Sequence, residues 1–161
     1  MYKVSLAIPI YNVSLFVERA LLSVLNQTYD NIEYLIVDDK RQDDSMDIVH
    51  RIIKDHPRLK DVRIIENPYN IGLGATRNTA IDNAQGEYLF FMDSDDEIIP
   101  TCIEILVHKM QEHPVDFIAA SHMKKDLSGK TYPTYTYSTI LIQGDDLPVA
   151  QYRYAQNNDI Y

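Results

Sequence analysis

The amino-acid sequence predicts an α/β fold in which helices flank a mostly parallel β-sheet. Apolar, strand-like runs alternate with segments of helical periodicity from the N-terminus onward, as in consecutive βαβ units. Polar residues directly follow several of these runs, which is typical of the carboxyl edge of an open sheet. The apolar run 88–92 ends in three carboxylates within four positions, those of Asp93, Asp95 and Asp96.

The predicted elements follow the chain in order. Ser14 and Ser45 are candidate N-cap residues of the first two helices, and Pro57 and Pro114 lie beyond the ends of the second and fourth helices. Strands are expected at residues 4–9, 32–37, 62–65, 88–92 and 116–120, and helices at about 14–25, 45–56, 75–84 and 100–112.

The C-terminal part of the chain has a different pattern. Residues 124–130 are predicted to form a polar loop, and alternating tyrosine and hydroxyl side chains at 134–139 predict a strand that packs its tyrosines on the sheet. Residues 145–161 have no clear periodicity. We therefore expect an α/β domain over residues 1–123 and, at 124–161, the start of a second region that is truncated in this chain.

Composition excludes several classes of protein. The chain has 15 basic and 24 acidic side chains and a formal net charge of -9, which argues against a general surface for nucleic acid or anionic membranes. A single cysteine, Cys102, excludes an internal disulfide and is typical of a reducing compartment. With no signal-peptide pattern and no membrane-spanning window, we expect a cytoplasmic protein, with membrane attachment through a missing segment or a partner left open.

Polar groups follow four of the predicted strands. They are Tyr11 and Asn12, the pair Asp38 and Asp39, the glycine-containing turn 67–74, and the acidic run 93–96. Because the carboxyl ends of parallel strands share one edge, these groups should converge on one crevice. Considered alone, the pair at 38–39 could equally be a solvated turn or a helix cap.

The acidic run predicts a divalent cation. Carboxylates this close together repel one another unless one is protonated or a metal lies between them. Hard oxygen ligands favour Mg²⁺ or Mn²⁺, which also take ligands from substrate phosphates. Arg77, in the helix after the glycine-containing turn, could offer its planar fork of donors to a diphosphate, or it could be a surface residue that pairs with Asp82.

Competing motifs are incomplete. Gly72-Leu-Gly74 lacks the third glycine of a dinucleotide fingerprint, and no Gly-Lys-Ser/Thr phosphate loop is present. A calcium loop beginning at Asp93 would need a glycine where Ile98 stands.

Four segments in order resemble the signature of family 2 glycosyltransferases, which have the GT-A fold, a Rossmann-like α/β domain that binds a nucleotide sugar. The resemblance covers roughly the first hundred residues. The segments are Ser5-Leu-Ala-Ile-Pro-Ile-Tyr-Asn12, Tyr34-Leu-Ile-Val-Asp-Asp39, Asn70-Ile-Gly-Leu-Gly-Ala-Thr-Arg-Asn78 and Gly86-Glu-Tyr-Leu-Phe-Phe-Met-Asp-Ser-Asp-Asp96.

The resemblance implies roles for individual residues. Asp93 would approach the ribose and, with Asp95, the metal, while Asp96 would lie near the transferred sugar. Asp95 and Asp96 would thus serve the reaction, and Asp159 is a weak candidate for the general base. The implied donor site comprises Pro9, Tyr11, Asn12, Asp38, Asp39, Gly72, Arg77, Asp93 and Ser94.

The chain departs from the family pattern in two places. Members often carry Gly-Ser-Thr-Asp after the first acid pair, whereas this chain has Lys40-Arg-Gln-Asp43, which bears on the loop conformation and the base preference. The family's general base lies well beyond the acidic run, and few residues follow Asp96 here. We therefore expect the donor-binding part of a longer enzyme.

The predicted function is metal-dependent transfer of a sugar, with inversion, from a nucleoside-diphosphate sugar to a hydroxyl of a glycan or lipid-linked acceptor. A UDP-sugar is the favoured donor, and polysaccharide biosynthesis at the inner face of the membrane is the expected setting. Two alternatives are a binding module of the same fold without turnover, and a phosphoacceptor receiver domain that would use Asp38, Asp39 and Asp93. The acid pair after the second strand argues against the receiver domain.

Overall fold

The computed structural model describes residues 1–126 and 128–133. The chain forms two compact units, Met1–Val115 and Asp116–Tyr161. The elements are β1 (Val4–Ile10), α1 (Val17–Leu25), β2 (Ile32–Asp38), α2 (Ser45–Ile53), a 3-10 turn (Leu59–Asp61), β3 (Val62–Glu66), α3 (Leu73–Asn83), β4 (Tyr88–Phe91), α4 (Cys102–Glu112), β5 (Met123–Lys125) and β6 (Thr131–Pro133).

The first unit contains a parallel sheet with strand order β3-β2-β1-β4, as the alternation of elements predicted. Every residue of β1 and β2 is buried, which explains why both strands are apolar runs rather than alternating ones. Pro9 is tolerated in β1 because the β1–β4 ladder ends at the pair Ala7–Phe91. The N–H group that Pro9 lacks would therefore have had no partner strand on that side.

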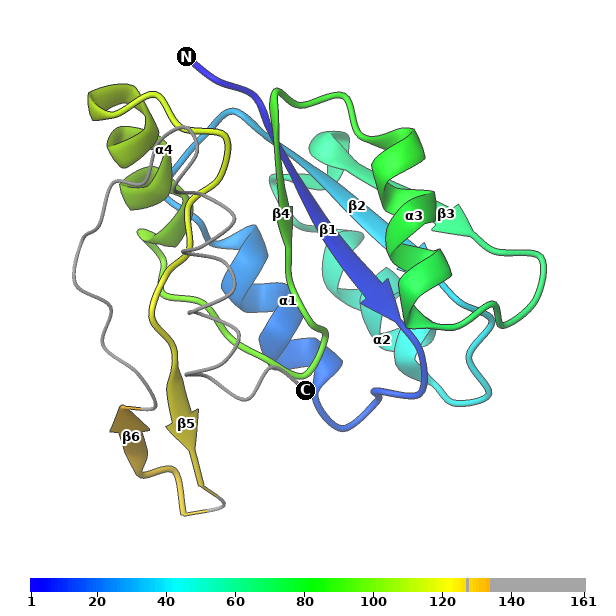
Figure 1. Ribbon diagram of the computed structural model, residues 1–161. Coiled ribbons are helices and arrows are strands. Elements are labelled where there is room, and N and C mark those ends of the chain that lie inside the picture. Colours follow the sequence, from blue (N-terminus) through cyan, green and yellow to red (C-terminus); the bar gives the residue numbers. More distant parts are fainter. Residues whose placement is uncertain (127, 134–161) are drawn as a thin grey trace. The chain divides into compact units, whose positions relative to one another are not determined.

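Helices cover both faces of this sheet (Figure 1). On one face, Leu6 and Ile8 of β1 pack in the larger core with residues of α1, α2 and α4. On the other face, Ala7 of β1 packs with Leu35 of β2 and Ala80 of α3. Small residues at positions 7 and 80 let α3 approach the sheet closely.

Two strands mark the point where the chain changes direction across the sheet. From β1 the chain moves outward to β2 and β3, and α3 then carries it back over the sheet to β4 on the other side of β1. The carboxyl ends of β1 and β4 are therefore the topological switch point, where open α/β sheets bind ligands.

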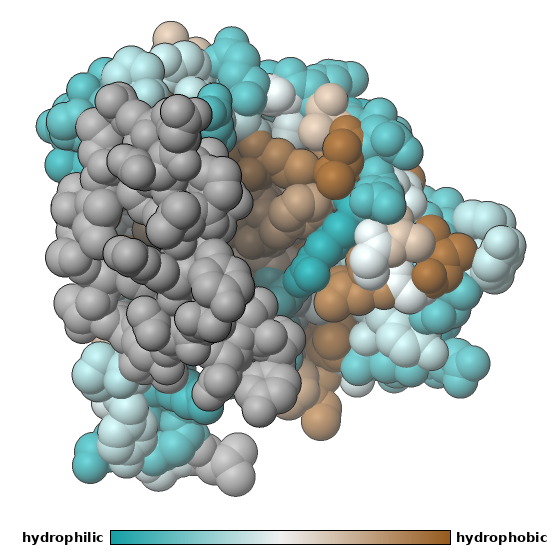
Figure 2. Space-filling model, viewed as in Figure 1, coloured by the Kyte–Doolittle hydropathy of each residue, from teal (hydrophilic) through white to brown (hydrophobic). Residues whose placement is uncertain are grey.

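Several predicted elements differ in the structure. The first helix begins at Val17 rather than Ser14, and Leu15 is 86% exposed, because a turn in which Val17 N–H bonds to the Val13 carbonyl precedes it. Ser14 therefore does not cap α1, and the Ser45 side chain does not cap α2. Although residues 88–92 are an apolar run, β4 is only half-buried, and Phe91 is 37% exposed. Figure 2, which is viewed as Figure 1, shows hydrophobic surface in the centre of the side of the molecule that faces the reader.

The prediction of a strand at residues 116–120 is wrong. That stretch has no regular structure and is mostly exposed, because none of the described strands pairs with it. Of the predicted polar loop 124–130, Lys124 and Lys125 belong to β5, which pairs antiparallel with β6, while residues 126 and 128–130 lie between the two strands. The strand predicted at 134–139 lies outside the described residues. No helix in the part of the chain that the structure describes is long and apolar enough to cross a bilayer.

A buried carboxylate joins three strands near the amino ends of β1, β2 and β4. Glu33 of β2 accepts hydrogen bonds from the Ser5 hydroxyl at 2.5 Å and from the Gln85 N–H at 2.6 Å, and its Oε2 lies 3.4 Å from Lys3 Nζ. Gly86 is required beside it, because a Cβ there would lie 2.6 Å from the Ser5 nitrogen. Burial opposes the charge, but these hydrogen bonds and Lys3 outweigh it and hold the pKa of Glu33 below its ordinary value.

This cluster predicts an acid-sensitive contribution to stability. Because the pKa of Glu33 is lower in the folded chain, its stabilisation is complete above the unfolded pKa of about 4.3 and is lost as pH falls through the folded value. At pH 7 we expect Glu33→Gln to lower the free energy of unfolding by about 1–2 kcal/mol, since a hydrogen-bonded charge is removed. The difference from wild type should shrink as the pH falls below about pH 5. Urea denaturation at each pH measures it, and a difference independent of pH would contradict the assignment.

Candidate functional site

The predicted polar groups lie at one edge of the sheet. Tyr11 and Asn12 follow β1, Asp39 follows β2, and the turn 67–72 follows β3. The acidic run from Asp93 follows β4 after the buried Met92. Because all four strands are parallel, these groups come from the same edge, as expected from the sequence.

Asp39 organises the turn between β3 and α3. Its carboxylate is only 3% exposed and accepts hydrogen bonds from Asn67 Nδ2 at 2.8 Å, Ile71 N–H at 2.9 Å and Gly72 N–H at 3.0 Å. Burial disfavours its charge, but these donors and Thr76 together hold the pKa of Asp39 below its ordinary value. Because the Asp39 carboxylate is buried and bonded to donors of the protein, it fixes the conformation of the turn between β3 and α3. Little of the carboxylate is left to contact a ligand.

The sequence analysis did not single out Asn67 and Thr76, which complete this network. Asn67 is 3% exposed, donates to Thr76 Oγ1 at 3.2 Å and accepts from the Thr79 hydroxyl at 3.0 Å. Its position at a strand tip, directly before Pro68, was a signal that the sequence contained. Gly72, the N-cap of α3, has φ +83°. Glycine adopts this conformation at no steric cost, and it places the Gly72 N–H on Asp39.

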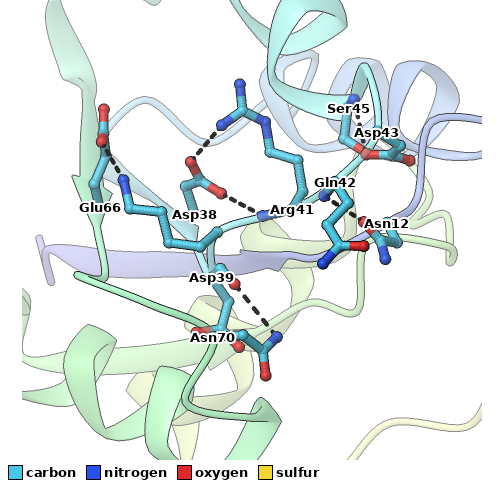
Figure 3. Close-up of polar contacts among 10 residues, drawn as sticks. Asn12, Asp38, Asp39, Arg41, Gln42, Asp43, Ser45, Glu66 and Asn70 are labelled. Atoms are coloured by element: carbon cyan, nitrogen blue, oxygen red, sulfur yellow. Dashed lines mark hydrogen bonds and ion pairs between the residues drawn. The ribbon is translucent and has the colours of Figure 1, made fainter.

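Asp38 forms an ion pair with Arg41, one of the loop residues that depart from the family pattern. Asp38 is 1% exposed, and its Oδ2 lies 2.8 Å from Nη1 of Arg41, whose backbone N–H also donates to Oδ1 at 3.3 Å (Figure 3). Lys40, with φ +55°, turns the chain here and pairs with Glu66 at the end of β3 at 2.8 Å. The bulkier Lys-Arg sequence is therefore accommodated by two ion pairs that point away from Asp39.

The turn after β1 is hydrogen-bonded to the loop after β2. Gln42 N–H donates to Asn12 Oδ1 at 2.8 Å (Figure 3), and Ser14 N–H donates to Asp43 Oδ2 at 2.9 Å. Val13 N–H donates to the Ser45 hydroxyl at 2.9 Å. The side chains of Asn12 and Asp43 thus act as hydrogen-bond acceptors within the protein.

Arg77 is a residue of α3, and its side chain reaches the acidic run. Its Nη2 is 2.7 Å from Asp93 Oδ1, and its guanidinium carbon lies 5.9 Å from the centre of the Phe91 ring. Arg77 therefore pairs with Asp93 and not with Asp82. Its Nε is buried and has no hydrogen-bond partner among the described residues. A partly exposed arginine placed in this way can exchange donors between Asp93 and an incoming anion.

The acidic run forms a turn in which Asp96 N–H donates to the Asp93 carbonyl at 3.1 Å. Ser94 is buried, whereas Asp93, Asp95 and Asp96 are exposed. No group of three or more His, Cys, Asp or Glu side chains that could hold a metal ion occurs within residues 1–126 and 128–133. The oxygen donors of Asp93 and Asp95 still suit Mg²⁺ or Mn²⁺, which commonly take one or two carboxylates together with substrate phosphates.

One further predicted site residue is buried, and another is not among the described residues. Pro9 is buried within β1, two residues before Tyr11. Asp159, the candidate general base, lies outside the described residues.

Comparison with known proteins identifies the class to which this edge belongs. Residues 5–156 match the model of Glycosyl transferase family 2. The chain is 38% identical, over 129 residues, to the Escherichia coli protein named UDP-Glc:alpha-D-GlcNAc-diphosphoundecaprenol beta-1,3-glucosyltransferase WfaP, and covers 49% of it. The match takes in 78% of this chain. Among eight curated relatives, the match takes in between 17% and 59% of the relative's own length, so the chain corresponds to only part of each.

Two solved structures have the same architecture. The Staphylococcus aureus TarS 1–349 structure in complex with UDP-GlcNAc matches with a TM-score of 0.65 and 26% identity over 82% of this chain and 37% of TarS 1–349. The mannosyltransferase PcManGT from Pyrobaculum calidifontis, in complex with GDP-Man and Mn2+, matches with a TM-score of 0.65 and 25% identity over 71% of this chain and 34% of PcManGT.

Together, the fold and these matches define a GT-A-type α/β domain. The chain belongs to glycosyl transferase family 2. Family membership agrees with the resemblance drawn from the four sequence segments, and it favours that interpretation over a receiver domain.

The Asp38–Arg41 pair predicts a large effect from a loop substitution. We expect Arg41→Ala to lower the free energy of unfolding by about 2 kcal/mol, because it leaves a buried carboxylate without its cation. Arg51→Ala is the matched control, since Arg51 pairs with Glu18 at 2.9 Å with both side chains more than half exposed. That substitution should cost less than about 1 kcal/mol. Equal losses in chemical denaturation would contradict the role given to Arg41.

The backbone at Lys40 leads to a second prediction. A non-glycine residue at φ +55° is sterically disfavoured by about 1 kcal/mol. Lys40→Ala and Lys40→Gly both remove the ion pair with Glu66, but only glycine relieves the backbone. We expect the glycine variant to be more stable than the alanine variant by about 1 kcal/mol in urea denaturation. An alanine variant of equal or greater stability would show that the loop does not hold this conformation in solution.

Proposed function

We propose that this chain is the donor-binding part of a glycosyltransferase and binds a nucleoside-diphosphate sugar at the carboxyl edge of β1 and β4. The observation that carries the proposal is the Arg77–Asp93 pair beside the exposed Asp95 at the topological switch point. A cation held by carboxylates and an arginine that can reach a phosphate are the two groups that a diphosphate requires in a protein of net charge -9.

The residues would divide the work as follows. Asp95, with Asp93, would hold Mg²⁺ or Mn²⁺, which would stabilise the charge that develops on the diphosphate leaving group. Arg77 and the N-terminal end of α3 would face the diphosphate with donors and a positive end. Tyr11, 43% exposed at the tip of β1, would line the nucleoside pocket, with Pro9 and Asn12 shaping the backbone beneath it. Asp96 would lie near the transferred sugar.

The donor and acceptor classes are supported by the relatives. A UDP-sugar is the favoured donor, since the E. coli relative is named for UDP-Glc and the TarS structure holds UDP-GlcNAc. Binding of Mn²⁺ by the mannosyltransferase supports the metal assignment. The name of the E. coli relative also supports a lipid-linked saccharide acceptor, and polysaccharide biosynthesis is the setting that we propose. The region at 124–161 would begin the acceptor side, and the acceptor hydroxyl would be deprotonated by a base that Asp159 is a candidate to supply.

Calorimetric titration of UDP tests the donor site. With Mn²⁺ we expect binding that EDTA abolishes, because the metal links the diphosphate to the carboxylates. Asp95→Asn should weaken this binding by about tenfold or more, the loss expected when a charged ligand becomes neutral. Asp82→Asn is the control, because it makes the same change at an exposed position of α3 to which no site role is given. Unchanged binding in Asp95→Asn would contradict the metal assignment.

A further inference from the structure

The turn after β1 is hydrogen-bonded through three consecutive residues to the loop and helix that follow β2. The side chain of the first residue and the backbone N–H groups of the next two make these bonds. Asn12 Oδ1 accepts from Gln42 N–H at 2.8 Å, Val13 N–H donates to Ser45 Oγ at 2.9 Å, and Ser14 N–H donates to Asp43 Oδ2 at 2.9 Å. The two segments are separated by about thirty positions in the chain, and β1 and β2 are adjacent strands. We call this set of three hydrogen bonds the loop clasp.

Asp43 is the central member of the loop clasp. One of its carboxylate oxygens accepts from Ser14 N–H, and the other accepts from the N–H and the hydroxyl of Ser45, at 3.1 and 2.5 Å. Burial opposes its charge, but these donors lower the pKa of Asp43 from its ordinary value. The Ser45 hydroxyl in turn accepts from Val13 N–H. Asp43 thus fixes two of the three clasp hydrogen bonds, one directly and one by orienting Ser45.

Tyr11 directly precedes the three residues that the loop clasp holds. It is 43% exposed, and within the described part of the chain its hydroxyl has no hydrogen-bond partner. The next residue, Asn12, has φ +51°, a conformation that is uncommon for a residue with a side chain. The clasp holds Asn12, Val13 and Ser14, and so restrains the direction in which the chain leaves β1, directly after Tyr11.

We propose that Asp43 is a positioning residue that pre-organises Tyr11 for nucleotide binding, through the loop clasp and without contact with the ligand. The inference rests on the proposed function, in which Tyr11 lines the nucleoside pocket. A residue held in its binding position before the ligand arrives loses less conformational freedom on binding. Loss of the clasp should therefore weaken nucleotide affinity through Tyr11.

The first experiment examines the clasp without any ligand. Amide hydrogen exchange is measured by NMR in wild type, Asp43→Asn and Asp44→Asn. We expect faster exchange at Val13 and Ser14 in Asp43→Asn, since the amide cannot accept from both segments as the carboxylate does. Asp44→Asn changes the adjacent, exposed carboxylate and should leave both amides protected. Unchanged exchange in Asp43→Asn would overturn the clasp.

The second experiment tests whether Asp43 acts through Tyr11. UDP is titrated with Mn²⁺ into wild type, Asp43→Asn, Tyr11→Ala and the double variant. We expect each single substitution to raise Kd by about tenfold, and the double variant to bind no more weakly than about twice the weaker single variant. A double variant whose loss equals the product of the two single losses would show independent effects and overturn the inference. A general loss of stability would not produce this coupling.

A second variant covers the case in which Asp43→Asn does not fold. Ser45→Ala removes the hydroxyl that receives Val13 N–H and leaves the carboxylate in place. We expect it to show the same coupling with Tyr11→Ala, and multiplicative losses would again overturn the inference. If wild type binds neither UDP nor GDP, TDP or CDP, the proposed function fails and the inference with it, whereas the exchange experiment still reports whether the clasp exists. Nucleotide binding with multiplicative losses overturns the inference alone.

Discussion

The buried carboxylate of Asp39 is the constraint on which the carboxyl edge of the sheet depends. Its backbone N–H donates a hydrogen bond to the Ile10 carbonyl of β1. Its carboxylate accepts hydrogen bonds from the Asn67 side chain and the Ile71 and Gly72 N–H groups, in the segment between β3 and α3. One residue therefore sets the relative positions of β1, β2 and the start of α3. A buried carboxylate is stable only when donors surround it, so the turn after β3 must take the conformation that brings its N–H groups to Asp39.

The other carboxylates of this edge are of two kinds: some are paired with basic residues of the protein, and others are exposed to solvent. Asp38 forms an ion pair with Arg41, and Lys40 forms one with Glu66. The two basic residues of the loop after β2 are therefore both paired with carboxylates of the protein. Asp95 is exposed, and no hydrogen bond or ion pair of its side chain occurs among the residues the structure describes. In the proposed function, this division between internal and outward-facing carboxylates would let an acidic domain offer both a cation site and an arginine to the same ligand.

The sequence predicted the four strands of the parallel sheet and the helices between them to within a few residues, because their apolar periodicity reflects burial. It failed at residues 116–120, where apolar residues predicted a strand that lacks a pairing partner in the described structure. It also failed at Ser14, whose N–H is taken by Asp43 in a distant segment. Local pattern carries no information on which distant group completes a hydrogen bond, so caps and edge strands were the elements it misplaced.

By itself, the sequence determined the fold class, the family and the edge of the sheet at which the polar residues gather. The fold class and the edge follow from period and order along the chain, which the parallel βαβ arrangement translates directly into position, and the family follows from the resemblance of four sequence segments. Only the tertiary structure decided the roles within that edge: Asp39 as an internal acceptor, Arg41 as the partner of Asp38, Arg77 as the partner of Asp93, and the clasp through Asp43. The reason is physical, since the state of a carboxylate depends on which donors lie within about 3 Å, and those donors come from segments far apart in the chain.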